Sequence, residues 1–345
     1  MSAPGFWKRI LGRPAAESGA ASETQPSTQP QPFLHQAAGG LSRYEIGAEL
    51  GRGAMAVVHL ATEKDSGRQV AIKRLALQRE FAAEDLIDVR QRFMREARAA
   101  GHLEHPDILQ VLDAGEAGQD AWIAMEYVQG QDLSHYTKLG QLLPVREALA
   151  LVARLARALA HAHAQGVVHR DIKPSNVMLD RARGALKIMD FGIARIADGS
   201  RTRTGLVLGT PSFMSPEQLA GLKVDGRSDL YSLGVLLYQL LTGQLPHQSD
   251  SMAKLMFQIA NQPAPDVRHL RPELPEALAL VVALSLEKRP ELRYASGATM
   301  AQDLEAVLAQ LPAADPAAPA GQDFTAADPF ARTERLERGE PGQNP

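Results

Sequence analysis

The chain of 345 residues has 45% apolar and 22% charged residues, which is the composition of a globular protein with a sizeable core. Lysine and arginine number 37 against 40 acidic residues, and a net charge of −3 excludes the overall basic field that would attract nucleic acid or an anionic membrane. Because cysteine is absent, disulfides, thiolate zinc sites and iron–sulfur clusters are excluded, and a reducing cytoplasm is the expected location.

Both ends of the chain are predicted to be disordered tails. Residues 1–40 and 312–345 are rich in small and polar residues, so they cannot bury enough apolar surface to offset their ordering entropy. The residues between them, 41–311, are predicted to fold as one block. The longest apolar runs, at 230–241 and 278–286, are shorter than the roughly 18 residues that span a bilayer, so no transmembrane segment is expected.

The first third of this block predicts an antiparallel sheet with one helix. Apolar or β-branched runs at 44–50, 55–62 and 69–75 are typical of strands, and a turn sequence at 64–67 joins the second run to the third. A helix follows, because apolar residues recur at steps of three and four at Leu86, Val89, Phe93, Ala97 and Ala100. Two further strands are expected at 108–113 and 121–127.

Beyond residue 140 the periodicity becomes helical. Leu149, Val152, Leu155 and Leu159 form one apolar stripe, and residues 230–241 are apolar all round, as in a helix at the centre of a core. The expected fold class is therefore α+β, with a small antiparallel sheet lobe that carries one helix and a larger, mainly helical lobe.

A glycine-containing turn lies between the first two predicted strands. Its sequence is Leu50-Gly51-Arg52-Gly53-Ala54-Met55-Ala56-Val57-Val58. Glycine lets backbone amides approach phosphate oxygens, but a tight hairpin that needs a positive φ has the same signature. A Walker A loop is excluded, because no Gly-Lys-Ser or Gly-Lys-Thr follows and the next element is a strand.

Lys73 ends the apolar run Val70-Ala71-Ile72 within the third predicted strand. It is either a surface lysine or an inward-facing ammonium beneath phosphates held by the glycine turn. A buried lysine needs a carboxylate to offset its desolvation. Glu96 is the best candidate because it lies on the apolar side of the predicted helix, and Glu80 and Glu84 are alternatives.

The strongest chemical signal is the segment Val168-His169-Arg170-Asp171-Ile172-Lys173-Pro174-Ser175-Asn176, followed by Lys187-Ile188-Met189-Asp190-Phe191-Gly192. Asn176 and Asp190 offer hard oxygen ligands from two loops, and such ligands suit a Mg²⁺ ion that also binds substrate phosphates. Asp171 remains to accept a proton from a hydroxyl group. A lone loop aspartate is usually a turn or cap residue, whereas the full pattern predicts phosphoryl transfer.

Taken in order, these motifs resemble the eukaryotic-like Ser/Thr protein kinases of bacteria over residues 42 to about 310. The matching elements are the glycine turn, Lys73, Glu96, the 169–176 loop, Asp190-Phe191-Gly192, Ser215-Pro216-Glu217, Asp229 and Arg293. The resemblance implies the bilobal protein-kinase fold, with an N-lobe at 41–125, a hinge at 126–130 and a C-lobe at 131–311.

The resemblance also implies catalytic roles. Lys73 would hold the α- and β-phosphates of ATP and pair with Glu96. Asp171 would orient the substrate hydroxyl and take its proton, and Lys173 would steady the γ-phosphate.

The same resemblance implies which residues would bind the metal and which would line the adenine pocket. Asn176 and Asp190 would bind Mg²⁺, with Mn²⁺ as the alternative metal. The implied adenine pocket comprises Leu50, Val58, Ala71 and Met178, Met125 as gatekeeper, and the backbones of Glu126 and Val128.

The segment from Asp190 to Glu217 is expected to regulate activity. Lys173 and the Gly-Thr-Pro step at Thr210 resemble the Ser/Thr-directed subgroup, in which this threonine braces the catalytic residues. Thr202 and Thr204 are the expected autophosphorylation sites, modified in trans by transient self-association, with Arg170 and Arg195 receiving the phosphates. A polar loop without that role is the alternative interpretation.

Two residues depart from the family pattern. Ala56 replaces the third glycine of the turn, so a changed nucleotide affinity is expected, and Ser215 replaces the usual alanine of Ala-Pro-Glu. Glu217 and Arg293 are expected to pair, and Asp229 to open the buried helix.

Protein substrates and a phosphothreonine-binding protein are the implied partners. The rival hypotheses are a pseudokinase scaffold and a small-molecule phosphotransferase.

Overall fold

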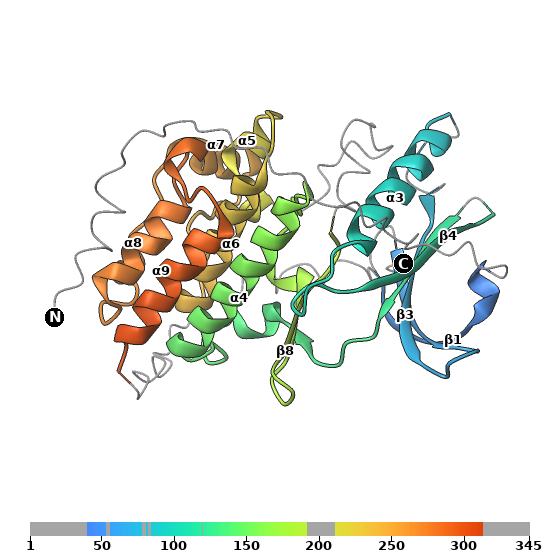
Figure 1. The fold of residues 1–345 in the computed structure, drawn as a ribbon. Helices are drawn as coiled ribbons and strands as arrows, with labels where there is room; N and C mark the ends of the chain where they lie inside the picture. The colour runs from blue at the N-terminus through green and yellow to red at the C-terminus, as the bar shows by residue number, and fades with distance from the viewer. Residues whose placement is uncertain are drawn as a thin grey trace, which may run out of the picture.

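The computed structural model describes residues 40–52, 56–77, 81, 84–118, 120–191 and 211–312. These residues form a sheet-rich N-terminal region and a mainly helical C-terminal region (Figure 1). The predicted α+β bilobal fold is thereby confirmed. The two predicted tails lie outside the described residues, apart from their inner ends.

Five antiparallel strands form the N-terminal sheet in the order β1-β2-β3-β5-β4. Their bounds are β1 Tyr44–Arg52, β2 Ala56–Glu63, β3 Gln69–Leu75, β4 Val111–Ala117 and β5 Asp120–Glu126. The strand predicted at 108–113 begins later, since Ile108 makes only an isolated bridge to Ile188. Its apolar run reflects a buried loop between the two regions, because burial selects apolar residues without requiring a ladder.

The side chains of the sheet alternate between two differently covered faces. Ala71, Lys73 and Leu75 lie on one face of β3, since successive residues of a strand point to opposite sides. Leu75 packs against the buried side of α3 (Leu86–Gly101) at Phe93, whereas Ile72 on the other face packs with Trp122. This alternation places Lys73 on the face that α3 covers.

The C-terminal region is built around two long helices that pack together, α4 (Val145–Ala164) and α6 (Gly226–Thr242). Nearly every α6 side chain is buried, as the all-round apolar sequence predicted. Around them lie α5 Pro216–Leu219, α7 Met252–Asn261, α8 Glu276–Ser285 and α9 Gly297–Gln310. Gly297 allows α9 to approach α4 closely, because a Cβ there would collide with the carbonyl oxygen of Ala156.

A second, three-stranded sheet lies between the two regions. Its strands are β6 Gln131–Asp132, β7 Val177–Asp180 and β8 Ala185–Ile188, in the order β6-β7-β8. Short 3₁₀ helices cover Gly40–Arg43, Leu133–Tyr136, Pro174–Asn176, Pro211–Phe213, Val267–His269 and Pro290–Leu292. Among the described helices, none has both the length and the apolar character needed to cross a membrane.

Candidate active site

The segment between α4 and β7 brings three predicted site residues together. Asp171 Oδ2 accepts hydrogen bonds from Lys173 Nζ at 2.7 Å and from Asn176 Nδ2 at 2.9 Å. Asn176 Nδ2 also donates to the main-chain oxygen of Asp171 at 2.7 Å. The side chain of Asp171 is 30% exposed, so its carboxylate is fixed by neighbours and still open to a reactant.

Lys73 is paired with the carboxylate of Asp190. Its Nζ lies 2.6 Å from Asp190 Oδ1, and the predicted pairing of Lys73 with Glu96 stays a prediction. The requirement for a counter-charge was correct, since the Lys73 side chain is only 13% exposed. Helical periodicity identifies the face on which Glu96 lies, but it does not give the distance between α3 and β3.

A buried carboxylate holds the backbone of residues 168–176, the predicted catalytic segment. Asp229, in the first turn of α6, has no exposed surface and accepts hydrogen bonds from the backbone N–H groups of His169 at 2.8 Å and Arg170 at 2.7 Å. His163 Nε2 lies 2.7 Å from the same carboxylate. The N-terminal end of the α6 dipole also favours a negative charge there. Asp229 thereby restrains Arg170 at a positive φ of 69°.

His169 connects the catalytic segment to the turn that carries Asp190. Its Nε2 donates to the carbonyl oxygen of Met189 at 2.7 Å, while its Nδ1 accepts from the backbone N–H of Asp171 at 3.2 Å. This pattern requires a neutral imidazole with the proton on Nε2. The ring also packs edge-on against Phe191, with 4.7 Å between centroids. The sequence analysis gave His169 no role.

An apolar cluster next to Lys73 contains four of the residues that were predicted to line an adenine pocket. Ala71 and Met125 are buried together, with Val58 and Val128 packed against them. The same cluster contains Leu109 and Met189, which the sequence analysis did not single out. The remaining predicted lining residues are Leu50, which is exposed on β1, and Met178, which is half-buried on β7.

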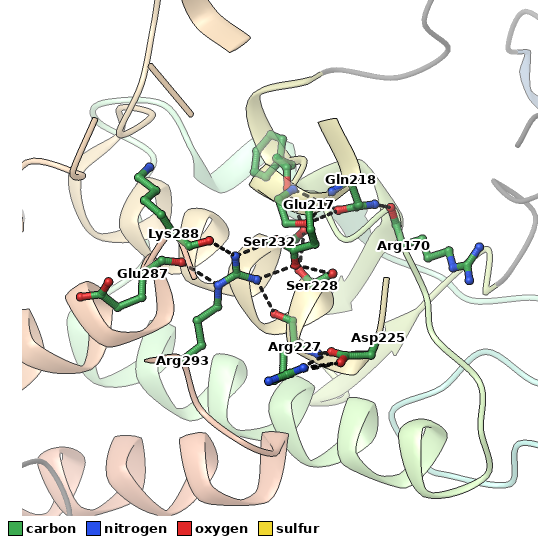
Figure 2. Close-up of polar contacts among 12 residues, drawn as sticks. Arg170, Glu217, Gln218, Asp225, Arg227, Ser228, Ser232, Glu287, Lys288 and Arg293 are labelled. Carbon is green, nitrogen blue, oxygen red and sulfur yellow. Dashed lines mark hydrogen bonds and ion pairs between the residues drawn. The ribbon is translucent and has the colours of Figure 1, made fainter. Parts of the chain in front are cut away.

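The predicted Glu217–Arg293 pair forms a buried, bidentate ion pair in the C-terminal region (Figure 2). Two guanidinium nitrogens of Arg293 lie 2.7 Å from the two carboxylate oxygens of Glu217, and Ser228 Oγ donates to the same carboxylate at 2.5 Å. Burial raises the pKa of Glu217, but hydrogen bonds from Arg293 and Ser228 together outweigh burial and lower that pKa overall. The carboxylate is therefore ionised in the fold.

Gln218, the neighbour of Glu217, links the Glu217–Arg293 pair to the backbone of Arg170 in the predicted catalytic segment. Its Nε2 donates to the main-chain oxygen of Arg170 at 2.8 Å (Figure 2). Its Oε1 accepts from the backbone N–H of Ser215, whose hydroxyl caps α5 in return. The sequence contained the signal for this capping box, a serine followed three residues later by glutamine.

The other predicted site residues are distributed as follows. Gly51 and Arg52 end β1 and Ala56 and Val57 begin β2, while Arg52 forms a surface ion pair with Glu49. Eight predicted positions lie outside the described residues. Three are in the glycine-containing turn, Gly53, Ala54 and Met55, and five are in the segment after Phe191: Gly192, Arg195, Thr202, Thr204 and Thr210.

Comparison with known families identifies this arrangement. The sequence profile of the protein kinase domain matches residues 44–304. The chain belongs to the protein kinase family. The resemblance predicted from the ordered motifs is thus confirmed over residues 44–304.

Two curated relatives of this chain come from bacteria. A probable serine/threonine-protein kinase of Streptomyces coelicolor is 44% identical over 275 residues, which cover 77% of this chain and 40% of the relative. The serine/threonine-protein kinase PknB of Mycobacterium leprae is 43% identical over 270 residues, covering 76% of this chain and 42% of PknB. The chain thus spans about two fifths of the length of these relatives.

A solved structure has a similar fold. The crystal structure of the Mycobacterium tuberculosis PknI kinase domain has a TM-score of 0.63 and 33% sequence identity with this kinase. The match covers 77% of this chain and 96% of the PknI domain. The bilobal architecture is therefore that of a bacterial kinase domain.

Proposed function

We propose that this chain is a serine/threonine protein kinase that transfers the γ-phosphoryl group of ATP to serine and threonine hydroxyls of proteins. The observation that carries the proposal is the hydrogen-bonded group of Asp171, Lys173 and Asn176. Membership of the kinase family supports the use of ATP, and the serine/threonine kinases among its relatives support the choice of acceptor.

The charged and apolar groups on this face of β3 suit a nucleoside triphosphate. The adenine base would enter the apolar cluster around Ala71 and Met125, and the Lys73 ammonium on the same face of β3 would bind the α- and β-phosphates. The 2.6 Å contact between Lys73 and Asp190 brings phosphate-binding and metal-binding groups together. A phosphate group beside both would be positioned close to Asp171.

The side chains present fit a magnesium ion, and Mn²⁺ would suit the same oxygen ligands. Asp190 contributes a carboxylate, and Asn176 keeps its amide oxygen for a metal because its Nδ2 donates to Asp171. Two protein ligands suffice, since Mg²⁺ usually retains water and binds substrate phosphates. When bound, the metal would neutralise charge on the phosphate oxygens.

Asp171 is the proposed acceptor of the substrate proton. The hydroxyl oxygen would form a bond to the γ-phosphorus, the bond from that phosphorus to the β–γ bridging oxygen would break, and ADP would leave. The hydroxyl proton would pass to the Asp171 carboxylate, and Lys173 would offset the charge of the transferred group. A partly exposed carboxylate held by two donors suits this exchange.

Regulation by autophosphorylation is part of the proposal. Thr202 and Thr204 are the proposed sites, modified in trans during transient self-association, and a phosphothreonine-binding protein is a proposed partner. Mass spectrometry of the wild type beside Lys73→Met, made in the same host, tests this. Phosphate absent from both threonines of the wild type, or equal in the inactive variant, would refute it.

A cytoplasmic location is proposed because ATP is supplied there.

Phosphoryl transfer is tested with radiolabelled ATP. The purified chain of 345 residues should label a generic protein acceptor on serine and threonine, and Lys73→Met should abolish the labelling without loss of folding. Transfer to aminoglycosides or choline would instead identify a small-molecule phosphotransferase. ATP binding without any transfer would identify a pseudokinase scaffold.

A further inference from the structure

Lys288 lies in the short segment between α8 and the 3₁₀ helix Pro290–Leu292. Its Nζ donates hydrogen bonds to the main-chain oxygen of Ile259 on α7 at 2.8 Å and to Nε2 of His247 at 3.1 Å. Because an ammonium group only donates, this Nε2 is the unprotonated nitrogen of a neutral imidazole. The half-buried Lys288 side chain is thus held by two neutral acceptors.

The charged groups around Lys288 do not give it a close counter-charge. The carboxylate of Glu217 is bound by Arg293, and Figure 2 shows the Glu287 carboxylate pointing away from the Lys288 ammonium. A second cation lies nearby, since the Tyr231 ring centroid is 5.8 Å from Lys288 Nζ and 4.9 Å from the Arg293 guanidinium carbon. Burial and repulsion between two cations over one ring both disfavour the charged form of the lysine.

The protonation of Lys288 and His247 reflects these surroundings. Burial, followed by the charge of Arg293, lowers the pKa of Lys288 from 10.5 to about 8, although Glu287 acts in the opposite direction. Burial and the Lys288 ammonium lower the pKa of His247 to about 4, so this imidazole is neutral near pH 7.

A lowered lysine pKa has a chemical consequence, because only the neutral amine is a nucleophile. At pH 7 an amine with a pKa of about 8 is neutral in roughly a tenth of the molecules, against roughly one in 3,000 at a pKa of 10.5. Desolvation next to another cationic group is a general way to activate a lysine as a nucleophile.

We propose that Lys288 is a nucleophilic lysine that is acylated by small acyl phosphates, with His247 accepting the released proton. The neutral Nζ attacks the carbonyl carbon of the donor, an N–C bond forms, and the C–O bond to phosphate breaks. Inorganic phosphate leaves with the electron pair, and the proton lost by Nζ passes to Nε2 of His247 and then to water. A small donor is required because the lysine is half-buried between α7 and the segment that carries His247.

Acylation would change what Lys288 holds together. The ammonium has three N–H donors and the amide that replaces it has one, so the bonds to Ile259 and to His247 cannot both persist. The bond to Ile259 connects the segment after α8 to α7. Acylation is therefore expected to weaken the attachment of α7.

The test measures acetylation of the purified chain of 345 residues by acetyl phosphate as a function of pH, with peptide mass spectrometry as the readout. The rate at Lys288 should level off above about pH 8. The exposed Lys254 on α7 is the matched control, and its rate should keep rising by about tenfold per pH unit up to about pH 9.5, as for an ordinary amine. Near pH 7 Lys288 should react roughly tenfold faster than Lys254.

Two substitutions of His247 test the cause of this reactivity. His247→Glu places a carboxylate beside the ammonium, which should raise the pKa of Lys288 and lower its acetylation rate near pH 7 by about tenfold. His247→Gln is the matched neutral substitution, because its amide oxygen accepts a hydrogen bond from Nζ without adding charge. Its Lys288 rate should still level off above about pH 8.

Thermal melting followed by circular dichroism establishes that each variant is folded. A Lys288 rate that rises in parallel with the Lys254 rate, or a Lys288 that stays unmodified while Lys254 reacts, would overturn the inference. A folded His247→Glu protein that is acetylated at Lys288 as fast as wild type would also overturn it. If His247→Glu does not fold, the wild-type pH profile decides alone. The inference does not depend on the proposed phosphoryl transfer, which is measured separately with radiolabelled ATP.

Discussion

Replacement of Arg293 by methionine should destabilise the C-terminal region severely. Arg293 and Glu217 are 0% and 6% exposed, so the substitution leaves a buried carboxylate without its counter-charge. The guanidinium also donates to the main-chain oxygens of Glu287, Lys288 and Arg227 (Figure 2). Methionine has a similar reach and no donor, so every one of these acceptors loses its partner.

The size of the effect follows from the burial of the pair. Removing one member of a buried ion pair usually costs about 3–5 kcal/mol, because the other charge stays desolvated. The loss of packing against Tyr231, whose ring centroid lies 4.9 Å from the Arg293 guanidinium carbon, adds to it. For a folded region of this size we expect the melting temperature to fall by roughly 6–20 °C.

Urea and thermal unfolding followed by circular dichroism measure this loss. Arg289→Met is the matched control, because Arg289 lies four residues away and forms an exposed pair with Glu291. Exposed pairs contribute about 0–1 kcal/mol, so the control should melt close to wild type. The double variant Glu217→Gln/Arg293→Met should be more stable than Arg293→Met, since it lacks the buried charge. Equal stabilities of Arg293→Met and Arg289→Met would refute the reasoning.

Three further predictions concern the site and its supports. Asp171→Asn should lower turnover by about 10²–10⁴-fold with little change in nucleotide affinity; loss of ATP binding in calorimetry would contradict this. Asp229→Asn should be destabilised by about 1–3 kcal/mol in urea, because an amide offers fewer acceptors to the N–H groups of His169 and Arg170; a wild-type midpoint would contradict it. The stabilisation from Glu217, whose folded pKa is lowered from 4.5, should be complete above that value and lost as pH falls through the folded pKa; a difference between wild type and Glu217→Gln that does not shrink on acidification would contradict this.

Local patterns predicted most of the fold because they depend on neighbours in the sequence. Strands β2 and β3 and helix α3 lie within a residue or two of their predicted positions, since alternation and helical periodicity report directly which face is buried. The strand predicted at 108–113 was displaced because Ile108 and Leu109 are buried in a loop. An apolar run alone does not distinguish a strand from a buried loop.

Contacts between distant elements could not be predicted in the same way. The pairing of Lys73 with Asp190 depends on how the two regions are set against each other, and no local pattern encodes that geometry. Glu126 and Lys187, whose side chains form an ion pair, are 61 residues apart and are ordinary charged residues in sequence. Gln218 was the exception, since its capping-box spacing was visible, although its bond to Arg170 was not.

Carboxylates that support the backbone differ in exposure from carboxylates that would take part in phosphoryl transfer. Asp229 and Glu217 are buried and bind only protein groups, whereas the Asp171 and Asp190 side chains are each 30% exposed. Arg170 and Asp190 also have positive φ angles of 69° and 61°, a conformation that is unfavourable for residues other than glycine. Surrounding bonds must hold such a backbone, and the buried Asp229 does so at Arg170. Substitutions of the buried carboxylates therefore act first on stability, while substitution of Asp171 acts on phosphoryl transfer in a protein that still folds.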